Sequence, residues 1–409
     1  MATVKFLLDS LLEHPPRTAP VVLAGFCAFL NLFVTQPILP LLAAIFHAGK
    51  AAVSLTVTAA TFGVALAAPF AGLIADRVGR KQVIVWSAAI LGLTTLGCAT
   101  ANNLSWLIFW RFLQGLATPG VFAVTVAYVN DEWPAARAAS AVGAYVSGTV
   151  LGGFSGRVLA GLLSQYLNWR WAFVVVGLIS LGIAVILWWG LPAEKKFAVA
   201  TRRSHFLLDA LSHVRNRRLL ATYVCGFCVL FTMVALFTYV TFHLAAPPFL
   251  LSPGWLGSIF CVYLVGAAVT PWAGRGIDRF GHRKAVMGAS ALGVAGALVS
   301  LAPNVWVILV GLTLCSCGVF IAQSAAVSYI GTVAFHNRAL AVGIYVSFYY
   351  AGGSFGSSAP AWLWDRFGWP GCVGLIVCVQ ATLAMIATFG WPARVAKPSG
   401  TAYLRTYPE

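Results

Sequence analysis

Two arginines stand inside long apolar stretches, where a fixed charge needs a partner. Arg111 lies in the stretch that starts near Leu104, and Arg157 lies in the stretch that starts near Ala139. Counted at about 1.5 Å per helical residue, each guanidinium would sit roughly 10 Å from the end of its helix that we expect to be external. A charge at such a depth usually faces a bundle interior or water.

No carboxylate is expected at that depth. The acidic residues all map to loops, tails or helix ends: Asp9, Glu13, Asp76, Asp131, Glu132, Glu194, Asp209, Asp278, Asp365 and Glu409. The arginines must therefore use backbone carbonyls, aromatic faces, water or an anionic ligand as partners. An anionic ligand would give them a working role and the other partners a structural one, and both alternatives stay open.

Other polar side chains also fall within apolar stretches. The first stretch holds Asn31, Thr35 and Gln36 beside Pro37 and Pro40, and prolines in a spanning helix mark a kink or a cavity wall. These polar groups could face a substrate, or they could join neighbouring helices by hydrogen bonds. The remaining candidates for substrate contact or coupling are Gln114, Tyr239, His243, Gln323, Tyr345 and Tyr349.

These residues belong to a sequence that is written twice. Residues 141–169 recur about 200 positions later as residues 341–369, a type of period that indicates duplicated units. Each copy carries a ridge of small residues that lets helices touch backbone to backbone. The ridge residues are Gly148, Gly152, Gly153 and Gly156 in the first copy and Gly352, Gly353 and Gly356 in the second. Neither arginine recurs, since Ser357 stands opposite Arg157 and Gly311 lies near the place of Arg111, which favours a working role for at least one of them.

A charged loop is repeated at nearly the same offset. Within residues 72–81 the pattern consists of Gly72, Asp76, Arg77, Gly79 and Arg80. Glycines permit tight turning and close approach, a carboxylate can satisfy free amides at a helix start, and basic side chains reach headgroup level. The echo comprises Gly274, Asp278, Arg279 and Gly281. Two copies at one offset argue against a chance charged turn.

The composition places both copies in a membrane. Hydrophobic residues make up 60% and charged residues 9% of the chain, whereas soluble globular chains are roughly 25% charged. Windows of about 19 residues give about twelve apolar stretches, each near the roughly 20 residues that cross a bilayer. They start near Pro20, Ser54, Val83, Leu104, Ala139, Trp171, Leu220, Trp255, Ala285, Val305, Leu340 and Gly371. We expect an all-α integral membrane protein of two pseudo-symmetric six-helix bundles.

The net charge of +16 reflects topology and not nucleic-acid binding. Basic residues gather in alternate loops and in the C-terminal tail, and positive loops stay cytoplasmic. We therefore expect both termini in the cytoplasm. The expected parts are a bundle over 1–191, a cytoplasmic linker over 192–218, a second bundle over 219–393 and a cytoplasmic tail over 394–409. Within the linker, residues 206–220 are predicted to form an amphipathic surface helix.

Enzyme and metal chemistry find little support in the motifs. Cys225 with Cys228, and Cys315 with Cys317, have the spacing of redox or metal pairs. No histidine or carboxylate is near them, so we interpret them as small packing residues and expect no metal and no cofactor. Residues 352–356 formally match a G-x-S-x-G elbow, but they lie on a glycine ridge and not on a strand-to-helix turn. The phosphate-binding loop of ATP-driven pumps is also absent from the sequence.

The repeated motifs resemble those of a known family. The loop at 72–81 and its echo resemble the signature loop of the major facilitator superfamily. Residues 111–115 are similar to that family's helix-four motif, and residues 148–161 to its helix-five antiporter motif, with Gly153 where the usual proline would stand. Residues 35–40 and 169–173 are similar to stretches in the bacterial drug:proton antiporter-like branch. The resemblance covers essentially the whole chain.

The resemblance implies two bundles that rock about one central site, which opens alternately to each side of the membrane. The similarity to the bacterial branch also implies a location in the bacterial inner membrane. Asp76 and Arg80 would form a cytoplasmic latch with Asp131 or Glu132, and this latch would hold the external-open state. Arg111 would occupy the position that the family links to coupling.

The sequence thus predicts a monomeric secondary transporter in the lipid bilayer that exports small organic molecules with the proton gradient. The unpaired Arg111 and Arg157 motivate an alternative, a transporter of a small organic anion such as a carboxylate. A membrane-embedded enzyme is a remote alternative.

Overall fold

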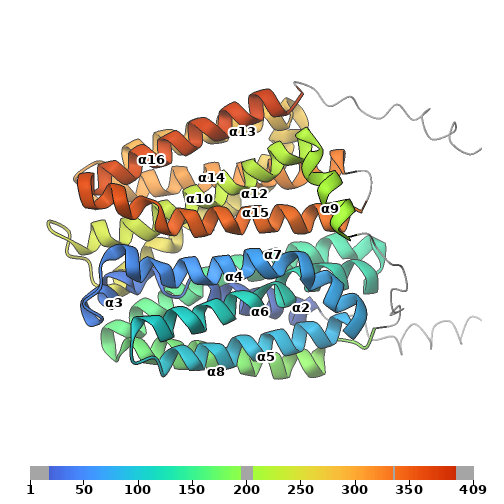
Figure 1. The fold of residues 1–409 in the computed structure, drawn as a ribbon, viewed down its shortest axis with the longest axis horizontal. Coiled ribbons are helices and arrows are strands. Elements are labelled where there is room, and N and C mark those ends of the chain that lie inside the picture. The colour runs from blue at the N-terminus through green and yellow to red at the C-terminus, as the bar shows by residue number, and fades with distance from the viewer. Residues whose placement is uncertain (1–17, 195–205, 335–336, 393–409) are drawn as a thin grey trace, which may run out of the picture.

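Two bundles of long helices lie side by side (Figure 1). The structure is a computed structural model that describes residues 18–194, 206–334 and 337–392, and over these ranges it contains helices and no strands. The first bundle comprises α2 (Thr18–Leu32), η1 (Gln36–Ile38), α3 (Leu39–Ile45), α4 (Lys50–Val78), α5 (Arg80–Ala99), α6 (Leu104–Glu132), α7 (Ala135–Tyr166) and α8 (Trp169–Gly190). The second comprises α10 (Arg217–Ala245), α11 (Pro253–Ser258), η2 (Ile259–Cys261), α12 (Val262–Phe280), α13 (His282–Val299), α14 (Val305–Val333), α15 (Arg338–Ser358) and α16 (Pro360–Gly390). The tail expected over 394–409 lies outside the described residues.

The helices make up the predicted membrane-crossing segments. In the described part of the chain, ten helical stretches are long and apolar enough to cross a membrane. α13 and α15 are not among them, because α13 opens with His282, Arg283 and Lys284 and α15 is rich in glycine, serine and tyrosine. Both nevertheless run alongside the other helices (Figure 1). The prediction of an all-α protein built from two six-helix bundles is confirmed.

The outer faces of the helices are apolar. Large side chains such as Phe62, Trp86 and Leu178 are exposed, and Trp189 and Phe389 are 81% and 87% exposed. Contiguous apolar surface of this extent is unfavourable in water but suits contact with lipid chains.

A proline breaks the first span. Pro37 has no backbone N–H and disfavours helical backbone at the residue before it. α2 accordingly ends at Leu32, and the chain turns through η1 before α3 begins. The last carbonyl oxygens of a helix have no intrahelical donor. Those of Asn31 and Leu32 are therefore available to other groups.

The segment predicted as a charged loop over 72–81 is almost entirely helical. Gly79 alone separates α4 from α5, with a φ of 105°, and Gly281 alone separates α12 from α13, with a φ of 84°. This left-handed backbone favours glycine. A Cβ at Gly72 or Gly274 would meet no described atom within 4 Å. Tight turning thus explains Gly79 and Gly281, whereas the predicted close approach is not seen at Gly72 and Gly274.

In both bundles the glycine ridge lets one helix touch the backbone of another. A Cβ on Gly148, Gly152 or Gly156 of α7 would collide with the backbone oxygens of Val22, Phe26 and Leu30 on α2, respectively. On α15, Gly352 and Gly356 meet the backbone of Phe227 and Phe231 on α10 in the same way. In each bundle the fifth span therefore packs directly on the first span, as the duplicated sequence requires.

The turn between the last two spans lies inside α16. Gly368 has a φ of 62° and a ψ of −147°, which interrupts the helix there. Cys372 Sγ lies 3.6 Å from Pro360 O, a distance that a straight helix between them could not give. The chain therefore reverses at Gly368, and its first part, before the glycine, extends the span of α15.

The linker helix is shorter than predicted. α9 (Phe206–Arg215) ends five residues before the expected end at Leu220. Asn216 instead starts α10, because its side chain accepts hydrogen bonds from the N–H groups of Arg218 at 3.0 Å and Leu219 at 3.4 Å.

Replacing Gly152 by Ala should destabilise the first bundle, because the new Cβ would strike the backbone of α2. Overpacking of this kind costs about 1–3 kcal/mol. Gly182→Ala is the matched control, since a Cβ there meets no described atom within 4 Å. Thermal unfolding in detergent compares the two variants. A melting temperature for Gly152→Ala at or above that of the control would contradict the ridge.

Candidate functional site

Arg111 is buried in the first bundle and is bound by oxygen atoms. Its Nε donates to Thr56 O at 3.1 Å, and its Nη1 donates to Asn31 O at 2.8 Å. Its Nη2 donates to Leu32 O. Two of these three carbonyls belong to the end of α2 that the proline leaves without helical donors. One side chain from α6 thus joins α2 and α4.

A chain of side-chain hydrogen bonds extends this arrangement. Gln114 accepts from Arg111 Nη1 through its Oε1 and donates to Thr95 Oγ1. Thr95 donates to Asn31 Oδ1 at 2.6 Å, and Asn31 Nδ2 donates to Ser180 Oγ at 2.9 Å. The buried charge is therefore balanced by oxygen dipoles from five helices, α2, α4, α5, α6 and α8. We refer to these groups as the Arg111 network.

Arg157 lies between the two bundles, among aromatic rings. Its side chain is 2% exposed. Its Cζ lies 4.7 Å from the ring centroid of Phe33, 4.6 Å from that of Phe260 and 4.8 Å from that of Tyr263. Such distances are those of cation–π contacts. The three rings form the cage; Phe33 belongs to the first bundle, and Phe260 and Tyr263 to the second.

Oxygen atoms complete the surroundings of Arg157. Its Nη1 donates to Gly153 O at 2.6 Å, and its Nε donates to Gln36 Oε1 at 2.9 Å. Gln36 in turn donates from Nε2 to Thr238 Oγ1 on α10 at 3.2 Å. Arg157 and Gln36, which the sequence singled out separately, therefore form one junction between the bundles.

Close backbone contacts surround this junction on α7 and α11. A Cβ on Gly257 would lie 2.6 Å from Arg157 O, so the two helices meet without side chains between them. Gln165 Oε1 accepts from Ser252 Oγ at 2.8 Å and from Gly254 N at 3.0 Å. These contacts seal the end of the molecule that carries residues 167–168 and 246–252, which we refer to as the closed end.

A second seam joins α4 to α15. Thr58 Oγ1 lies 2.7 Å from Ser357 Oγ, and Thr61 Oγ1 lies 2.9 Å from Ser354 Oγ, each pair in hydrogen-bond contact. Ser357 is the residue that stands opposite Arg157 in the duplicated sequence. At this position each copy thus contributes to contact between the bundles, one with a charge and one with a hydroxyl.

Tyrosines of α15 extend the contact toward the middle of the membrane. The ring centroids of Tyr345 and Tyr349 are 6.0 Å apart, those of Tyr349 and Tyr350 are 5.3 Å apart, and Tyr350 lies 5.9 Å from Phe122 of α6. Among the described residues, the buried hydroxyl of Tyr345 and the buried Oε1 of Gln323 have no hydrogen-bond partner. Buried polar atoms of this kind are uncommon and suit contact with a ligand.

The corresponding tyrosine of the first copy, Tyr145, has a hydrogen-bond partner. Tyr145 donates from its hydroxyl to Phe122 O at 3.0 Å. The tyrosine hydroxyl at this position is therefore hydrogen-bonded in the first copy and unpaired in the second, so Tyr145 serves as the reference for Tyr345.

The predicted latch residues meet at the other end of the first bundle, which we refer to as the basic end. Arg80 donates from Nη1 to Asp131 and to Ala127 O, the latter at 2.9 Å, and its Nη2 lies 3.5 Å from Asp76 Oδ1. The side chains of Asp76 and Asp131 are 45% and 49% exposed, and ion pairs in such places are each worth about 0–1 kcal/mol. All these groups belong to one bundle, and their role in holding one conformation stays a prediction.

Glu194 is a member of this cluster that the sequence did not reveal. Its Oε1 accepts from Lys81 N at 2.6 Å, at the start of α5. Lys81 Nζ donates to Leu191 O at 2.6 Å. The start of the linker is thereby fixed to the turn at Gly79. A carboxylate supplied from about 113 positions away leaves no local sequence signal.

In the part of the second copy that the structure describes, the equivalent ion pairs are absent. His282 stands where Arg80 stands in the first copy, and its ring packs 5.4 Å from that of Tyr329. Arg279 lies with its Cζ 5.3 Å from the Phe280 ring. The second copy of the motif keeps the turn at Gly281 but has no arginine at the position of Arg80 to pair with acidic side chains.

Two further candidates pack within the second bundle. Tyr239 donates to Ser357 O at 2.9 Å. His243 stacks on Trp369 with ring centroids 5.5 Å apart and meets the ring of Phe249 edge to face at 5.2 Å. Both lie near the closed end and not beside Tyr345. Thr35, by contrast, is buried, and its Oγ1 has no partner among the described residues.

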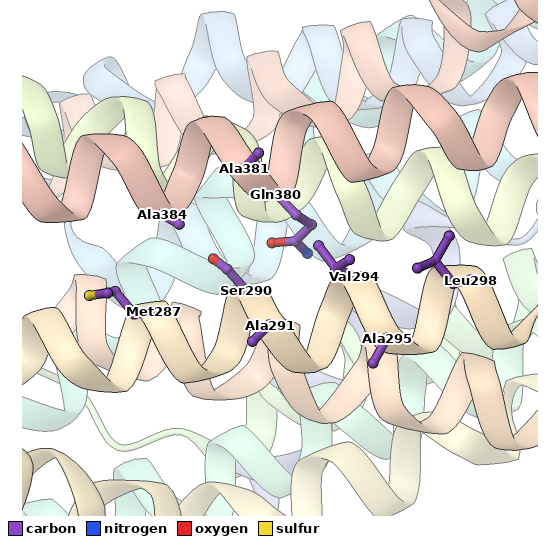
Figure 2. A pocket seen from close by; sticks show the side chains of 9 residues that line it. All are labelled: Met287, Ser290, Ala291, Val294, Ala295, Leu298, Gln380, Ala381 and Ala384. Atoms are coloured by element: carbon purple, nitrogen blue, oxygen red, sulfur yellow. The ribbon is translucent and has the colours of Figure 1, made fainter.

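A separate cavity opens between α13 and α16 (Figure 2). Its volume is about 460 Å³, and Ser290 and Gln380 line it from the two helices. Its rim includes Met287 and Leu298, which are 42% and 52% exposed. The cavity therefore lies on the outer side of the second bundle, away from the seams.

The duplicated bundles and their motifs match a known family over most of the chain. The profile of the Major Facilitator Superfamily matches residues 21–262 and 249–405. The chain belongs to the major facilitator superfamily. It is therefore a secondary transporter that works by alternating access, not an enzyme, and it acts on small-molecule substrates as a multi-pass membrane protein.

Relatives of similar length support the assignment. The chain is 32% identical over 375 residues to the "Uncharacterized MFS-type transporter YybF" of Bacillus subtilis, covering 91% of this chain and 92% of that one. It is 30% identical over 364 residues to the "Inner membrane transport protein YnfM" of Escherichia coli, covering 89% and 87%. It also matches the "Multidrug export protein EmrB" of Escherichia coli, with 25% identity over 42% of this chain and 33% of EmrB.

Solved transporters share the fold. A variant of the nucleoside transporter NupG has a TM-score of 0.74 at 14% identity, covering 91% of this chain and 98% of that one. A bacterial homologue of the human lysosomal transporter Spinster, in an inward-facing and occupied conformation, has a TM-score of 0.73 at 15% identity, covering 91% and 96%. At these identities the likeness concerns the fold alone.

Arg111→Met should destabilise the transporter, because it strands the acceptors on Asn31, Leu32 and Gln114. Each stranded buried acceptor costs about 1–3 kcal/mol. Arg77→Met, at an exposed position of the same bundle, should change the free energy of unfolding by less than about 0.5 kcal/mol. Thermal unfolding measures both. An unchanged melting temperature together with lost carboxylate binding would instead make Arg111 an anion ligand.

Proposed function

We propose that this transporter exports small, drug-like organic molecules across the bacterial inner membrane, driven by the proton gradient. The supporting observation is the wall formed by Tyr345, Tyr349, Tyr350 and Gln323, in which the Tyr345 hydroxyl and the Gln323 Oε1 are buried and unpaired. Aromatic faces with a few convergent hydrogen-bonding groups suit mostly apolar, uncharged or cationic organic molecules.

The alternative of a small anion has less support. An anion would need a guanidinium directed at it. Arg111 donates to three backbone oxygens and to Gln114, and Arg157 donates to Gly153 and Gln36 within the cage. Both cations are thus engaged by the protein itself.

Charge and relatives support the proposed direction of transport and the proposed membrane. Basic residues retain their loops on the cytoplasmic side, so we assign the basic end to the cytoplasm and the closed end to the outside. On that assignment the structure is closed to the outside, as in the inward-facing Spinster homologue. The names of YnfM and EmrB favour the inner membrane and export, respectively.

Proton coupling has to use groups near the helix ends. In the described spans every carboxylate lies in a terminal turn or beside the break at Gly368. Asp76 and Asp131 are two of these carboxylates, and both contact Arg80 at the basic end. We propose that the pair at the basic end exchanges protons with the cytoplasm.

Tyr345→Phe should weaken substrate binding about tenfold, the loss of one good hydrogen bond to a ligand, while leaving the melting temperature nearly unchanged. Tyr145→Phe is the matched control: it removes the hydrogen bond to Phe122 O and should lower stability with little effect on the dissociation constant. Binding of a fluorescent dye to purified protein, beside thermal unfolding, separates the two effects. Equal binding losses in both variants would contradict a substrate contact at Tyr345.

Reconstituted in vesicles, the transporter should change the luminal pH only when a transported dye is present, because exchange links the two flows. Vesicles without protein and vesicles with Asp131→Asn serve as controls, and the variant should bind dye but lose the pH change. A dye flux that is indifferent to an imposed pH gradient would refute proton coupling and leave facilitated transport.

A further inference from the structure

The surroundings of Arg157 are those of a bound ligand. Three rings lie within 4.8 Å of its Cζ, and two oxygen acceptors receive its N–H groups. Aromatic cages of this kind recognise organic cations, and planar guanidinium groups stack on rings while donating at their edges. The cage therefore binds a guanidinium, which here is the side chain of Arg157 on α7.

The cage is divided between two bodies that must separate. Phe33, Gln36 and Arg157 move with the first bundle, whereas Phe260 and Tyr263 move with the second. Alternating access requires the closed end to open at some stage. Opening removes the guanidinium from Phe260 and Tyr263.

The second-bundle part of the cage is supported by its own neighbours. Phe237 lies 5.3 Å from Phe260 and 4.5 Å from Tyr263, and Phe260 lies 5.6 Å from Tyr263. These three rings come from α10, η2 and α12. Since the cluster does not depend on the first bundle, its ring faces persist when Arg157 leaves.

We propose that the cage is a binding site for a planar organic cation with N–H donors, such as an alkylguanidinium or amidinium. Arg157 is its built-in occupant while the end is closed, and a free cation competes for the rings when the end opens. In the full cage the acceptors Gln36 Oε1 and Gly153 O favour a cation with donors, which a quaternary ammonium lacks, whereas the second-bundle rings alone favour a cation with a flat face. The proposal needs only alternating access and is independent of the transported molecule and of the direction of transport.

A free cation should shift the equilibrium between the open and closed arrangements in opposite directions in the wild type and in Arg157→Ala. In the wild type, a free cation binds the second-bundle rings only after Arg157 has left, so it favours the open arrangement. In Arg157→Ala the cage is vacant, and the same cation can sit between both sets of rings and favour closing. A general salt or denaturing effect would act in one direction on both proteins.

Spin labels on the two sides of the seam report the arrangement. Tyr166 at the end of α7 and Trp255 on α11 are 75% and 65% exposed and serve as labelling positions after replacement by cysteine. The exposed Cys261 and Cys378 are first replaced by alanine. The probe is methylguanidinium at millimolar concentration, compared with tetramethylammonium at equal ionic strength.

We expect methylguanidinium to raise the open-to-closed ratio of the wild type by about tenfold and to lower that of Arg157→Ala by a similar factor, the size expected from a few cation–π contacts. Tetramethylammonium should have a much smaller effect on Arg157→Ala. Tyr263→Leu in the wild type should abolish the response. Arg170→Ala, which removes a cation–π pair made within the first bundle, should leave it intact.

An unchanged label distance in the wild type would overturn the proposal even if Arg157→Ala failed to fold. Equal closing of Arg157→Ala by both cations would overturn the requirement for N–H donors, and a shift in the same direction in both proteins would overturn the cage as the site. A substrate that is still exported normally while the labels respond would separate this site from the transport site.

Discussion

A guanidinium in an apolar interior has to be surrounded by oxygen dipoles or ring faces when no carboxylate is within reach. This constraint shapes both halves of the molecule. Arg111 is accommodated because Pro37 ends α2 early and frees the carbonyls of Asn31 and Leu32. Arg157 is accommodated because rings from the opposite bundle close over it. The first solution stabilises one bundle, and the second depends on two bundles meeting.

The contacts within each bundle also differ from the contacts between the two bundles. Within a bundle, the glycine ridges put α7 on α2 and α15 on α10 with no side chain between the backbones, which makes each bundle a rigid body. Between bundles, α7 meets α11 backbone to backbone, and the side-chain contacts include hydroxyl pairs such as Thr58 with Ser357 and rings stacked on a cation. Such side-chain contacts are modest individually. A rigid unit joined to its neighbour by modest contacts is suited to rocking.

The sequence predicted the elements of the fold well because a bilayer allows few of them. Apolar length gave the spans and the repeat gave the two bundles, and Gly79 and Gly281 marked the turns. It also named Arg111, Gln114, Arg157 and Gln36, but it could not pair them. The rings that meet Arg157 lie more than 100 positions away, as does the Glu194 carboxylate that caps α5. Contacts of that kind depend on how helices are placed, and apolar periodicity contains no information on placement.

The tyrosine that occurs once in each copy suggests how duplicated bundles come to differ. Tyr145 is committed to Phe122 O, whereas Tyr345 keeps its hydroxyl unpaired. A change at a hydrogen-bonded group loses that bond, but a change at an unpaired group removes a cost. New ligand preferences are therefore reached most cheaply by altering α14 and α15, with the Arg111 network of the first bundle kept constant. The second bundle can then vary while the first keeps the fold stable.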